Sequence, residues 1–498
     1  MMMKKSLIIL FVLMLLAATH FSVSYGGSVG VAIPTDISET IDPHRATGAL
    51  TFEILYNIYE GLLQVDQDGN LVGLLATDWT ISEDGLNYEF KLKEGVTFHD
   101  GTPFTSEDVQ FTYERIMDPA TGYAKASNYK VIQEIKTPDA YTVQFSLIKP
   151  YSPFLALVSK IHILPSYSDA NFDLECVGTG PFYLMEWKRD SYLHLHRFEA
   201  YHTPGVPYLD EAYFKVIPDE NSRFMSLQTG VVDVIPRIDQ SFMSRIESDR
   251  AIKYVRAPMN LVQFMAINNK QTPLDDLRIR QALHYAIDRE LLIEFVAEGL
   301  ARPLNTHMTL MSPYAVDYDK YPYNPEKAME LLEKAGYGFG DLELTIALPQ
   351  PYEFHQRTGE VIAQMLEAVG IKIKLQIVEW GTWISDVYNG RKYDMTIIGI
   401  EGEPDPYIYL DRFYSYASRN FTNVSSEAID GWLDRLAVES DFEIRKELVS
   451  NVLKELADSA ASVWLMEPDE IVALRNNVMG WTIYPVYVDS LKDIWIQE

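Results

Sequence analysis

The adjacent side chains of His99 and Asp100 are the first candidates for acid–base chemistry in this sequence. Histidine exchanges protons near neutral pH, and a neighbouring carboxylate can orient it. However, Asp100-Gly101 follows a short strand-like stretch, and Asp-Gly is a strong turn signal. Thr105 and Asp108 then have the spacing of a capping box at a helix start. We therefore expect His99 and Asp100 to form a corner and not a catalytic site.

Three other patterns contain reactive residue types without a complete site. His194 and His196 share one strand face, as two metal ligands would, but no third ligand accompanies them, so a solvated face is the simpler interpretation. Ser146 and Lys149 match S-x-x-K on a strand, whereas the acylating motif needs a helix turn. Cys176 is the single cysteine, which excludes an intrachain disulfide. The P-loop, G-x-G-x-x-G, H-E-x-x-H and G-x-S-x-G motifs are absent, so no catalytic residue, metal or cofactor is predicted.

The N-terminus has the layout of a secretory signal peptide. Lys4 and Lys5 precede an apolar run from Ser6 to Ala18, and small residues follow up to Gly27. The run is shorter than the ~20 residues that span a bilayer, and no cysteine lies near the cleavage region. We expect residues 1–26 to be removed and the mature protein to be soluble in the periplasm without a lipid anchor.

Length and charge restrict the remaining possibilities. A chain of 498 residues is too long for one hydrophobic core, so two or three domains are expected. The formal net charge of −29 repels nucleic acid and anionic lipid. Strand-like and helix-like patterns alternate along most of the chain, which predicts an α/β fold.

Five ordered blocks of the sequence resemble the oligopeptide/dipeptide-binding family of solute-binding proteins, which serve ABC importers. They include LATDWTISEDGLNYEF, CVGTGPFYLMEW and INNKQTPLDDLRIRQALHYAIDRELL, and they occupy residues 75–113, 176–187, 214–234, 267–292 and 323–337. The resemblance implies a two-lobed periplasmic-binding-protein fold of type II, with an extra domain inserted in lobe one. Lobe one would comprise residues 27–50, 176–264 and 468–498, the inserted domain residues 51–175, and lobe two residues 265–467.

The resemblance implies that the protein captures a ligand without converting it. A ligand enters the cleft, the lobes close by rotation about a hinge, and the membrane subunits of an ABC permease receive the ligand. Di- and oligopeptides are the expected ligands, and the protein is expected to be a monomer. An oligosaccharide ligand is the second hypothesis, and a secreted hydrolase is the remote alternative.

The loop IEGEPDP follows a predicted strand and is the expected ligand-binding loop. Peptide binders of this type place an aromatic residue and then an aspartate here, and the aspartate pairs with the ammonium group of the peptide. In this sequence Ile400 stands at the aromatic position, and Glu403 is nearest to the aspartate, in a loop one residue shorter. Glu401, Gly402 and Asp405 are further candidates. Alternatively, the acidic residues only shape a proline-flanked turn.

The other candidates lie outside this loop. Dipeptide-binding relatives hold the peptide carboxylate with an arginine of lobe two, but Gln350 stands near that place, and Arg357 falls at a helix start. Trp380 and Trp383 have flat faces that suit sugar rings, although their spacing suits core packing equally well. Backbone groups near the cleft and a residue at the start of lobe two complete the predicted ligand-binding set: Thr47, Gly48, Thr179 and Asn268.

Overall fold

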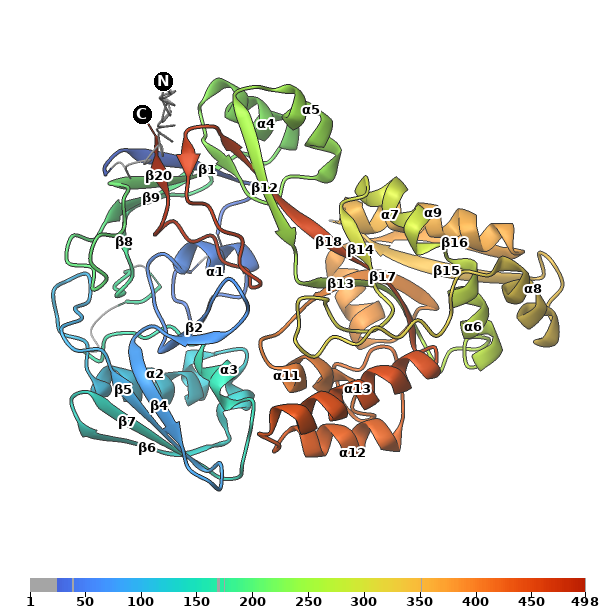
Figure 1. The fold of residues 1–498 in the computed structure, drawn as a ribbon, viewed down its shortest axis with the longest axis horizontal. Coiled ribbons are helices and arrows are strands. Elements are labelled where there is room, and N and C mark those ends of the chain that lie inside the picture. Colours follow the sequence, from blue (N-terminus) through green and yellow to red (C-terminus); the bar gives the residue numbers. More distant parts are fainter. Residues whose placement is uncertain (1–24, 38–39, 168–170, 174, 351, 498) are drawn as a thin grey trace, which may run out of the picture.

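The computed structural model describes residues 25–37, 40–167, 171–173, 175–350 and 352–497, and it has two α/β lobes side by side with a smaller β domain next to lobe one (Figure 1). Residues 1–24 of the predicted signal peptide (residues 1–26) lie outside the described residues. Among the helices of the described ranges, none has the length and apolarity needed to cross a membrane.

A twelve-stranded sheet runs through both lobes in the order β16-β15-β17-β13-β18-β11-β1-β10-β9-β8, and β12 and β14 also pair with β18. The strands of lobe one are β1 (Ser28–Ile33), β8 (Phe182–Lys188), β9 (Tyr192–Arg197), β10 (Glu211–Val216), β11 (Val234–Ile235) and β12 (Ile252–Pro258). Those of lobe two are β13 (Leu261–Ile267), β14 (Ala301–Pro303), β15 (Leu342–Pro349), β16 (Ile371–Val378) and β17 (Met395–Glu401). The long strand β18 (Ser462–Arg475) belongs to both lobes.

Two chain crossings connect the lobes. One is the Met259–Asn260 link between β12 and β13, where Asn260 has a φ of 51°. The other lies within β18, which pairs with β14 up to Pro468 and with β12 from Asp469 onward. Residues 261–264 were expected in lobe one, but they pair with β17 of lobe two. We propose the lobe boundary at Asn260.

Lobe one packs its helices and the end of the chain against this sheet. Its helices are α1 (Ala49–Leu55), α4 (Glu220–Thr229) and α5 (Met243–Ser248), and a small sheet is formed by β19 (Val478–Met479) and β20 (Trp495–Ile496). Asp219 caps α4 by accepting a hydrogen bond from Ser222 N, and Gly230 ends it with a φ of 76°. The apolar side chains of α1 and the following turn lie in the lobe-one core with those of β1 and β10.

The inserted domain has its own sheet and core. A hairpin of β2 (Leu63–Val65) and β3 (Leu71–Gly73) precedes an antiparallel sheet of β4 (Ala76–Ile81), β5 (Asn87–Leu92), β7 (Thr142–Leu147) and β6 (Ile132–Asp139). Helices α2 (Ser106–Met117) and α3 (Phe154–Val158) cover it. The core of this domain begins at Leu62 and ends at Ile163, so we propose these residues, and not 51–175, as its limits.

The corner at His99 and Asp100 belongs to the inserted domain. The expected capping box of Thr105 and Asp108 is present at the start of α2. His99 Nε2 lies 3.0 Å from Gly180 O, and Asp100 accepts a hydrogen bond of 2.9 Å from Thr102 N. Burial lowers the pKa of His99 to about 4. His99 therefore connects the inserted domain to the neighbouring loop of lobe one, and Asp100 shapes the turn.

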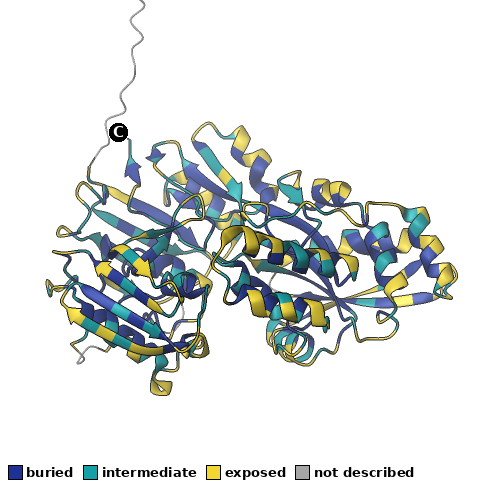
Figure 2. Ribbon diagram, turned by 60° about the horizontal axis from the view of Figure 1, so that its bottom comes forward, coloured by how far each residue is buried: buried dark blue, intermediate teal, exposed yellow. Residues whose placement is uncertain are grey.

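Lobe two has helices on both faces of its sheet. On one side lie α6 (Leu277–Ala286), α7 (Arg289–Ala297), α8 (Pro325–Lys334) and α9 (Glu353–Ala368), and on the other lie α11 (Pro406–Leu410), α12 (Glu427–Leu436) and α13 (Phe442–Asp458). A short turn, α10 (Trp380–Thr382), continues as a wider helical turn to Asn389. Figure 2 shows buried and exposed residues alternating along these helices, as expected for amphipathic helices that cover a sheet.

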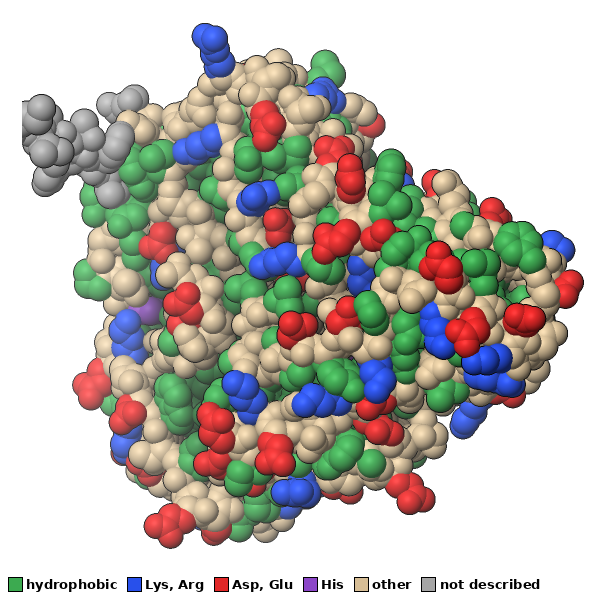
Figure 3. All heavy atoms as spheres, turned by 45° about the vertical axis from the view of Figure 1, so that its right-hand side comes forward, with side chains coloured by type: hydrophobic (Ala, Val, Ile, Leu, Met, Phe, Trp, Pro, Cys, Tyr) green, Lys and Arg blue, Asp and Glu red, His purple; other side chains and the backbone are tan. Residues whose placement is uncertain are grey.

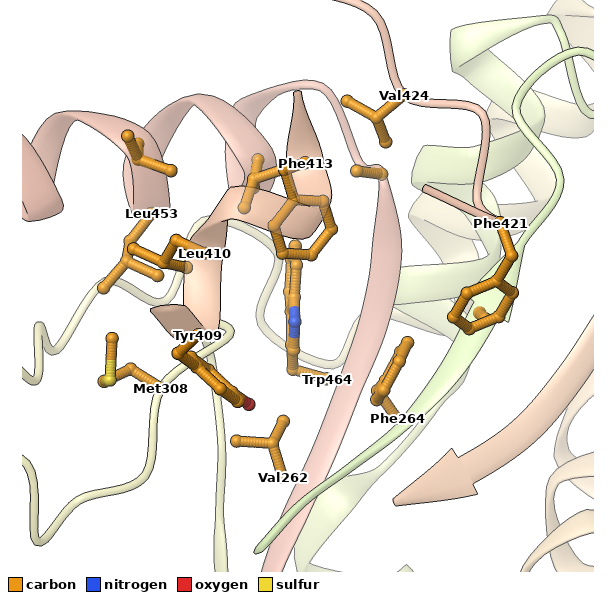
Figure 4. Packing of buried hydrophobic residues seen from close by; sticks show 14 of the residues in the cluster. Val262, Phe264, Met308, Tyr409, Leu410, Phe413, Phe421, Val424, Leu453 and Trp464 are labelled. Atoms are coloured by element: carbon orange, nitrogen blue, oxygen red, sulfur yellow. The ribbon is translucent and has the colours of Figure 1, made fainter. Parts of the chain in front are cut away.

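The core beside α11 and α13 fixes the loop that follows β17. Trp464 of β18 packs with Phe264 of β13 and with Tyr409 and Phe413, which follow that loop (Figure 4). Because large aromatic side chains bury much apolar surface, this contact holds the loop in a defined position next to the sheet.

Candidate functional site

A cavity of about 370 Å³ lies between the two lobes. Lobe one contributes residues of the segments 43–61 and 485–488, and the inserted domain contributes residues 63–65, 74, 123–125 and 159–162. The link between β12 and β13 supplies Met259 and Asn260, and the last residue of β17 and the loop after it supply residues 401–404. This volume is within the usual range for small-molecule sites.

Aromatic side chains form much of the lobe-one wall. Phe52 and Tyr56 come from α1 and the residue after it, whereas Tyr59, one turn later, is fully buried in the lobe-one core behind them. Tyr123 of the inserted domain and Tyr487 of the C-terminal segment add further rings. These faces offer apolar and stacking contact to a ligand without fixing its chemical identity.

Two lysines and two glutamates face each other across the cavity. Lys125 and Lys160 come from the inserted domain, and Glu401 and Glu403 come from lobe two. Lys160 and Glu403 form an ion pair that bridges the lobes, and their side chains are 27% and 23% exposed. Burial, together with the charge of Glu403, raises the pKa of Glu401. Burial, together with the charge of Lys160, lowers the pKa of Lys125.

Two neutral histidines also line the cavity. Arg115 donates to His44 Nδ1 at 2.7 Å, so the other ring nitrogen, Nε2, carries the proton and donates to His162 O at 2.9 Å. Burial lowers the pKa of both His44 and His162 to about 4. At neutral pH both rings are therefore uncharged, and the two ring nitrogens of His44 are already paired within the protein.

Asn260 joins the link between β12 and β13 to the loop after β17. Its carbonyl oxygen accepts a hydrogen bond of 2.7 Å from Gly402 N, and its Oδ1 accepts one of 2.7 Å from Thr309 Oγ1. Its Nδ2 donates to Pro485 O at 2.5 Å. A Cβ atom on Gly402 would lie 2.2 Å from Asn260 Oδ1, which explains the glycine at that position. The floor of the cavity is thus tied to both lobes.

Other contacts hold the lobes together around the cavity. Ser152 N of the inserted domain donates to Ala437 O at 2.9 Å, and the rings of Tyr151 and Tyr407 lie 5.8 Å apart. Ile408 of α11 is buried in the core of the inserted domain. The inserted domain and lobe two are therefore in direct contact beside the cavity.

Four of the predicted ligand-binding residues line the cavity: Thr47, Glu401, Gly402 and Glu403. Gly48 lies beside Thr47 and precedes α1. Ile400 pairs with Val262 within the sheet and packs against the lobe-two core.

The remaining predicted residues have structural contacts away from the cavity. Asp405 caps α11 and lies 2.6 Å from Arg445 in an ion pair. Arg357 lies 2.9 Å from Asp239 of lobe one. Thr179 is buried and donates to Glu60 at 2.9 Å, and Asn268 Nδ2 donates to two backbone carbonyl oxygens at 3.0 Å.

The two tryptophans stack on each other within lobe two. Trp380 and Trp383 have ring centroids 5.1 Å apart and nearly parallel planes. Trp383 is buried, and its Nε1 donates to Thr396 Oγ1 at 2.9 Å. Neither ring lines the cavity between the lobes. Their contacts are those of core packing, the alternative that the sequence left open.

Sequence reasoning missed Lys125, Lys160, Tyr56, Tyr123 and Asn260. They come from separate segments, so no local spacing marks them as one site. The abundance of tyrosine, with 31 residues, was the one available signal, and it does not select particular positions.

Comparison with known proteins identifies the family. Residues 70–421 match the bacterial extracellular solute-binding proteins, family 5. The chain belongs to this family. This family 5 protein is 31% identical over 368 residues to the glutathione-binding protein GsiB of Escherichia coli O6:K15:H31. The aligned region covers 72% of this chain and 71% of GsiB.

Solved structures of binding proteins share the fold. The ABC transporter substrate-binding protein CtaP of Listeria monocytogenes superposes with a TM-score of 0.88 at 25% identity, covering 95% of this chain and 100% of CtaP. The periplasmic binding protein DppA of Helicobacter pylori, in complex with the peptide STSA, gives 0.81 at 26% identity, covering 95% and 99%. The chain thus has the two-lobed type II fold of a solute-binding protein of ABC importers and is not an enzyme.

Proposed function

We propose that this family 5 protein captures di- or oligopeptides in the periplasm as a monomer and delivers them to the membrane subunits of an ABC importer. The observation that carries the proposal is the cavity enclosed between two lobes, with charged groups of both signs and aromatic walls. Relatives described as binding glutathione and the peptide STSA support the same ligand class.

Glu401 is the group that we assign to the ligand's ammonium. Glu403, the residue expected from the sequence, is already paired with Lys160. Glu401 makes no ion pair among the described residues, and its side chain is exposed to the cavity. A ligand ammonium would neutralise this carboxylate through a charge-assisted hydrogen bond, which is stronger than a neutral one.

The oligosaccharide hypothesis has less support. Its basis in the sequence was the missing lobe-two arginine, the missing aromatic residue at Ile400 and the pair Trp380 and Trp383, and neither tryptophan lines the cavity. Tyrosine faces remain available for sugar stacking, but the four charged side chains in the wall favour a charged ligand, because burying a charge without a partner is costly.

Mass spectrometry of co-purified ligands, followed by thermal shift with glutathione, a peptide library and an oligosaccharide panel, tests the proposal. A ligand at 100 times its Kd stabilises the folded state by about 2.7 kcal/mol. Stabilisation by an oligosaccharide and by no peptide would refute the peptide assignment. Recovery of a cleaved ligand would refute the binding role itself.

Glu401→Gln tests the ammonium assignment. We expect the variant to bind free-amine peptides about 10–100-fold more weakly, because a hydrogen bond to a charged group is lost. N-acetylated peptides should bind the variant and the wild type alike. Glu343→Gln, at an exposed strand position of lobe two, is the matched control. Equal loss for free and acetylated peptides would show that Glu401 acts only on the loop.

A further inference from the structure

The cations near the cleft differ in whether they are already paired. Arg357, which stood closest to the expected carboxylate-binding position, pairs with Asp239 and does not line the cavity. Arg237 is surrounded by carboxylates, with Asp489 at 3.3 Å, Glu470 at 3.6 Å and Glu53 in an ion pair. Neither arginine is available to a ligand.

The two lysines of the cavity wall differ in the same way. Lys160 is held by Glu403. Lys125 makes no ion pair or side-chain hydrogen bond with any described residue, so no described carboxylate oxygen lies within 4.0 Å of its Nζ. Among the described lysines and arginines that line the cavity, Lys125 is therefore the one left for a ligand anion.

The backbone at Lys125 is fixed although its side chain is open to the cavity. Ala126 N donates to Tyr123 O at 3.1 Å, and Asn128 N donates to Lys125 O at 3.0 Å, which forms the turn Ala126–Tyr129. Tyr129 is buried, and its hydroxyl donates to Leu157 O at 2.9 Å. A charged group on such a rigid support can orient a ligand without ordering a loop first.

The charges that surround Lys125 favour an anionic partner. Lys160 and Arg419 repel its ammonium, and Glu401 and Glu403 attract it from across the cleft without touching it. The four charged side chains of the wall sum to zero, with Lys160 and Glu403 paired to each other. Lys125 and Glu401 remain as one positive and one negative group on opposite lobes, so a ligand with both charges would neutralise both.

We propose that Lys125 of the inserted domain binds the carboxylate of the ligand, while Glu401 of lobe two binds its ammonium, so that the substrates are short zwitterionic peptides with both ends free. This inference rests on the proposed peptide-binding function. It assigns a role in ligand selection to the inserted domain, and it means that one charged end of the ligand contacts each side of the cleft and favours closure.

Three tripeptide libraries test the inference: one with free ends, one with C-terminal amides and one N-acetylated. Native mass spectrometry of the full-length mature protein measures the retained peptides and their Kd values. Wild type should bind free-acid peptides about 10–100-fold more tightly than the matching amides. Lys125→Met should reduce this ratio to about 1, whereas Lys125→Arg should preserve most of it. Lys130→Met, an exposed lysine nearby, should leave it unchanged.

The outcomes separate this inference from the function on which it rests. If wild type binds tripeptides but prefers neither acids nor amides, or if Lys125→Met keeps the wild-type preference, the role of Lys125 is refuted and peptide binding stands. If wild type retains no member of any library, the proposed function fails as well. Circular dichroism and light scattering must first show that the Lys125→Met variant is folded and monomeric. The acid-to-amide affinity ratio of Lys125→Arg is then compared with that of wild type, because this variant keeps the positive charge.

Discussion

Glu470→Gln should stabilise the protein at alkaline pH. Glu470 lies on β18, the strand that crosses between the lobes, and its side chain is 11% exposed. It shares Arg237 with Glu53 and Asp489, so three carboxylates surround one guanidinium. Burial raises the pKa of Glu470 from 4.5 to about 7 and that of Glu53 from 4.5 to about 8, with Arg237 opposing the shift.

The sign and size of the effect follow from these pKa values. A carboxyl group whose pKa is higher in the folded state holds its proton longer than in the unfolded state, so stability falls as pH rises from about 4.5 to about 7. At ~1.4 kcal/mol for each pH unit, the shift of Glu470 corresponds to about 3 kcal/mol. Glutamine has nearly the same shape and no charge. The variant should match wild type at pH 4 and exceed it by up to about 3 kcal/mol at pH 8.

Differential scanning calorimetry at pH 4 and pH 8 measures this prediction. At about 2 °C per kcal/mol, the gain at pH 8 is about 6 °C in Tm. Glu247→Gln, at an exposed position without an ion pair among the described residues, should shift Tm by less than about 1 °C at both pH values. A Glu470→Gln variant that is equal to or less stable than wild type at pH 8 would refute the argument that the cluster holds surplus negative charge.

Three further changes test the packing and the closure of the lobes. Lys160→Met removes the ion pair that bridges the cleft and should reduce the closed-to-open ratio about fivefold, a loss of about 1 kcal/mol. Double electron–electron resonance between spin labels on the two lobes measures this ratio, and an unchanged distance distribution would contradict the prediction. Gly178→Ala should destabilise by more than about 3 kcal/mol in urea unfolding, because the new Cβ would lie 2.0 Å from a backbone oxygen, whereas Gly431→Ala in the open face of α12 should stabilise slightly. Trp383→Ala should cost about 3–5 kcal/mol of stability and leave ligand affinity nearly unchanged, and the reverse pattern would place this ring in the site.

Local patterns in the sequence predicted the scaffold well. The capping box at Thr105 and the turn at Asp100 are present, because both depend on residues within four positions of each other. The family resemblance predicted the two lobes and the inserted domain, since five ordered blocks carry that topology. The lobe boundary that we propose at Asn260 differs from the expected one after residue 264, because the strand after the crossing continues the apolar pattern of its neighbours in both lobes.

The candidate site was predicted only in part. The segment from Glu401 to Glu403 lies at the end of a strand and could be located from the chain alone. The ion pair of Lys160 and Glu403 joins residues 243 positions apart in the sequence. It depends on how the inserted domain and lobe two are placed in the fold, which local sequence patterns do not show. Asp405 has the same charge as Glu403, but the cap of α11 and the ion pair with Arg445 hold it elsewhere. Charge identifies candidate ligand-binding groups, whereas their partners are fixed by tertiary structure.

Acidic and basic side chains are scattered over the face of the molecule drawn in Figure 3. Ion pairs between exposed side chains add little stability and are screened by salt. The charges that matter for binding are those enclosed in the cavity, where screening is weaker. We therefore expect ligand affinity to depend less on salt than the encounter rate does.

The capture of a ligand between two hinged lobes is tested most directly by small-angle X-ray scattering of the mature protein, stripped of ligand and then saturated with a peptide that thermal shift has identified. Closure predicts a smaller radius of gyration and a shorter maximum dimension in the saturated sample, with the peptide recovered intact afterwards. Identical scattering curves with and without bound peptide would contradict the account.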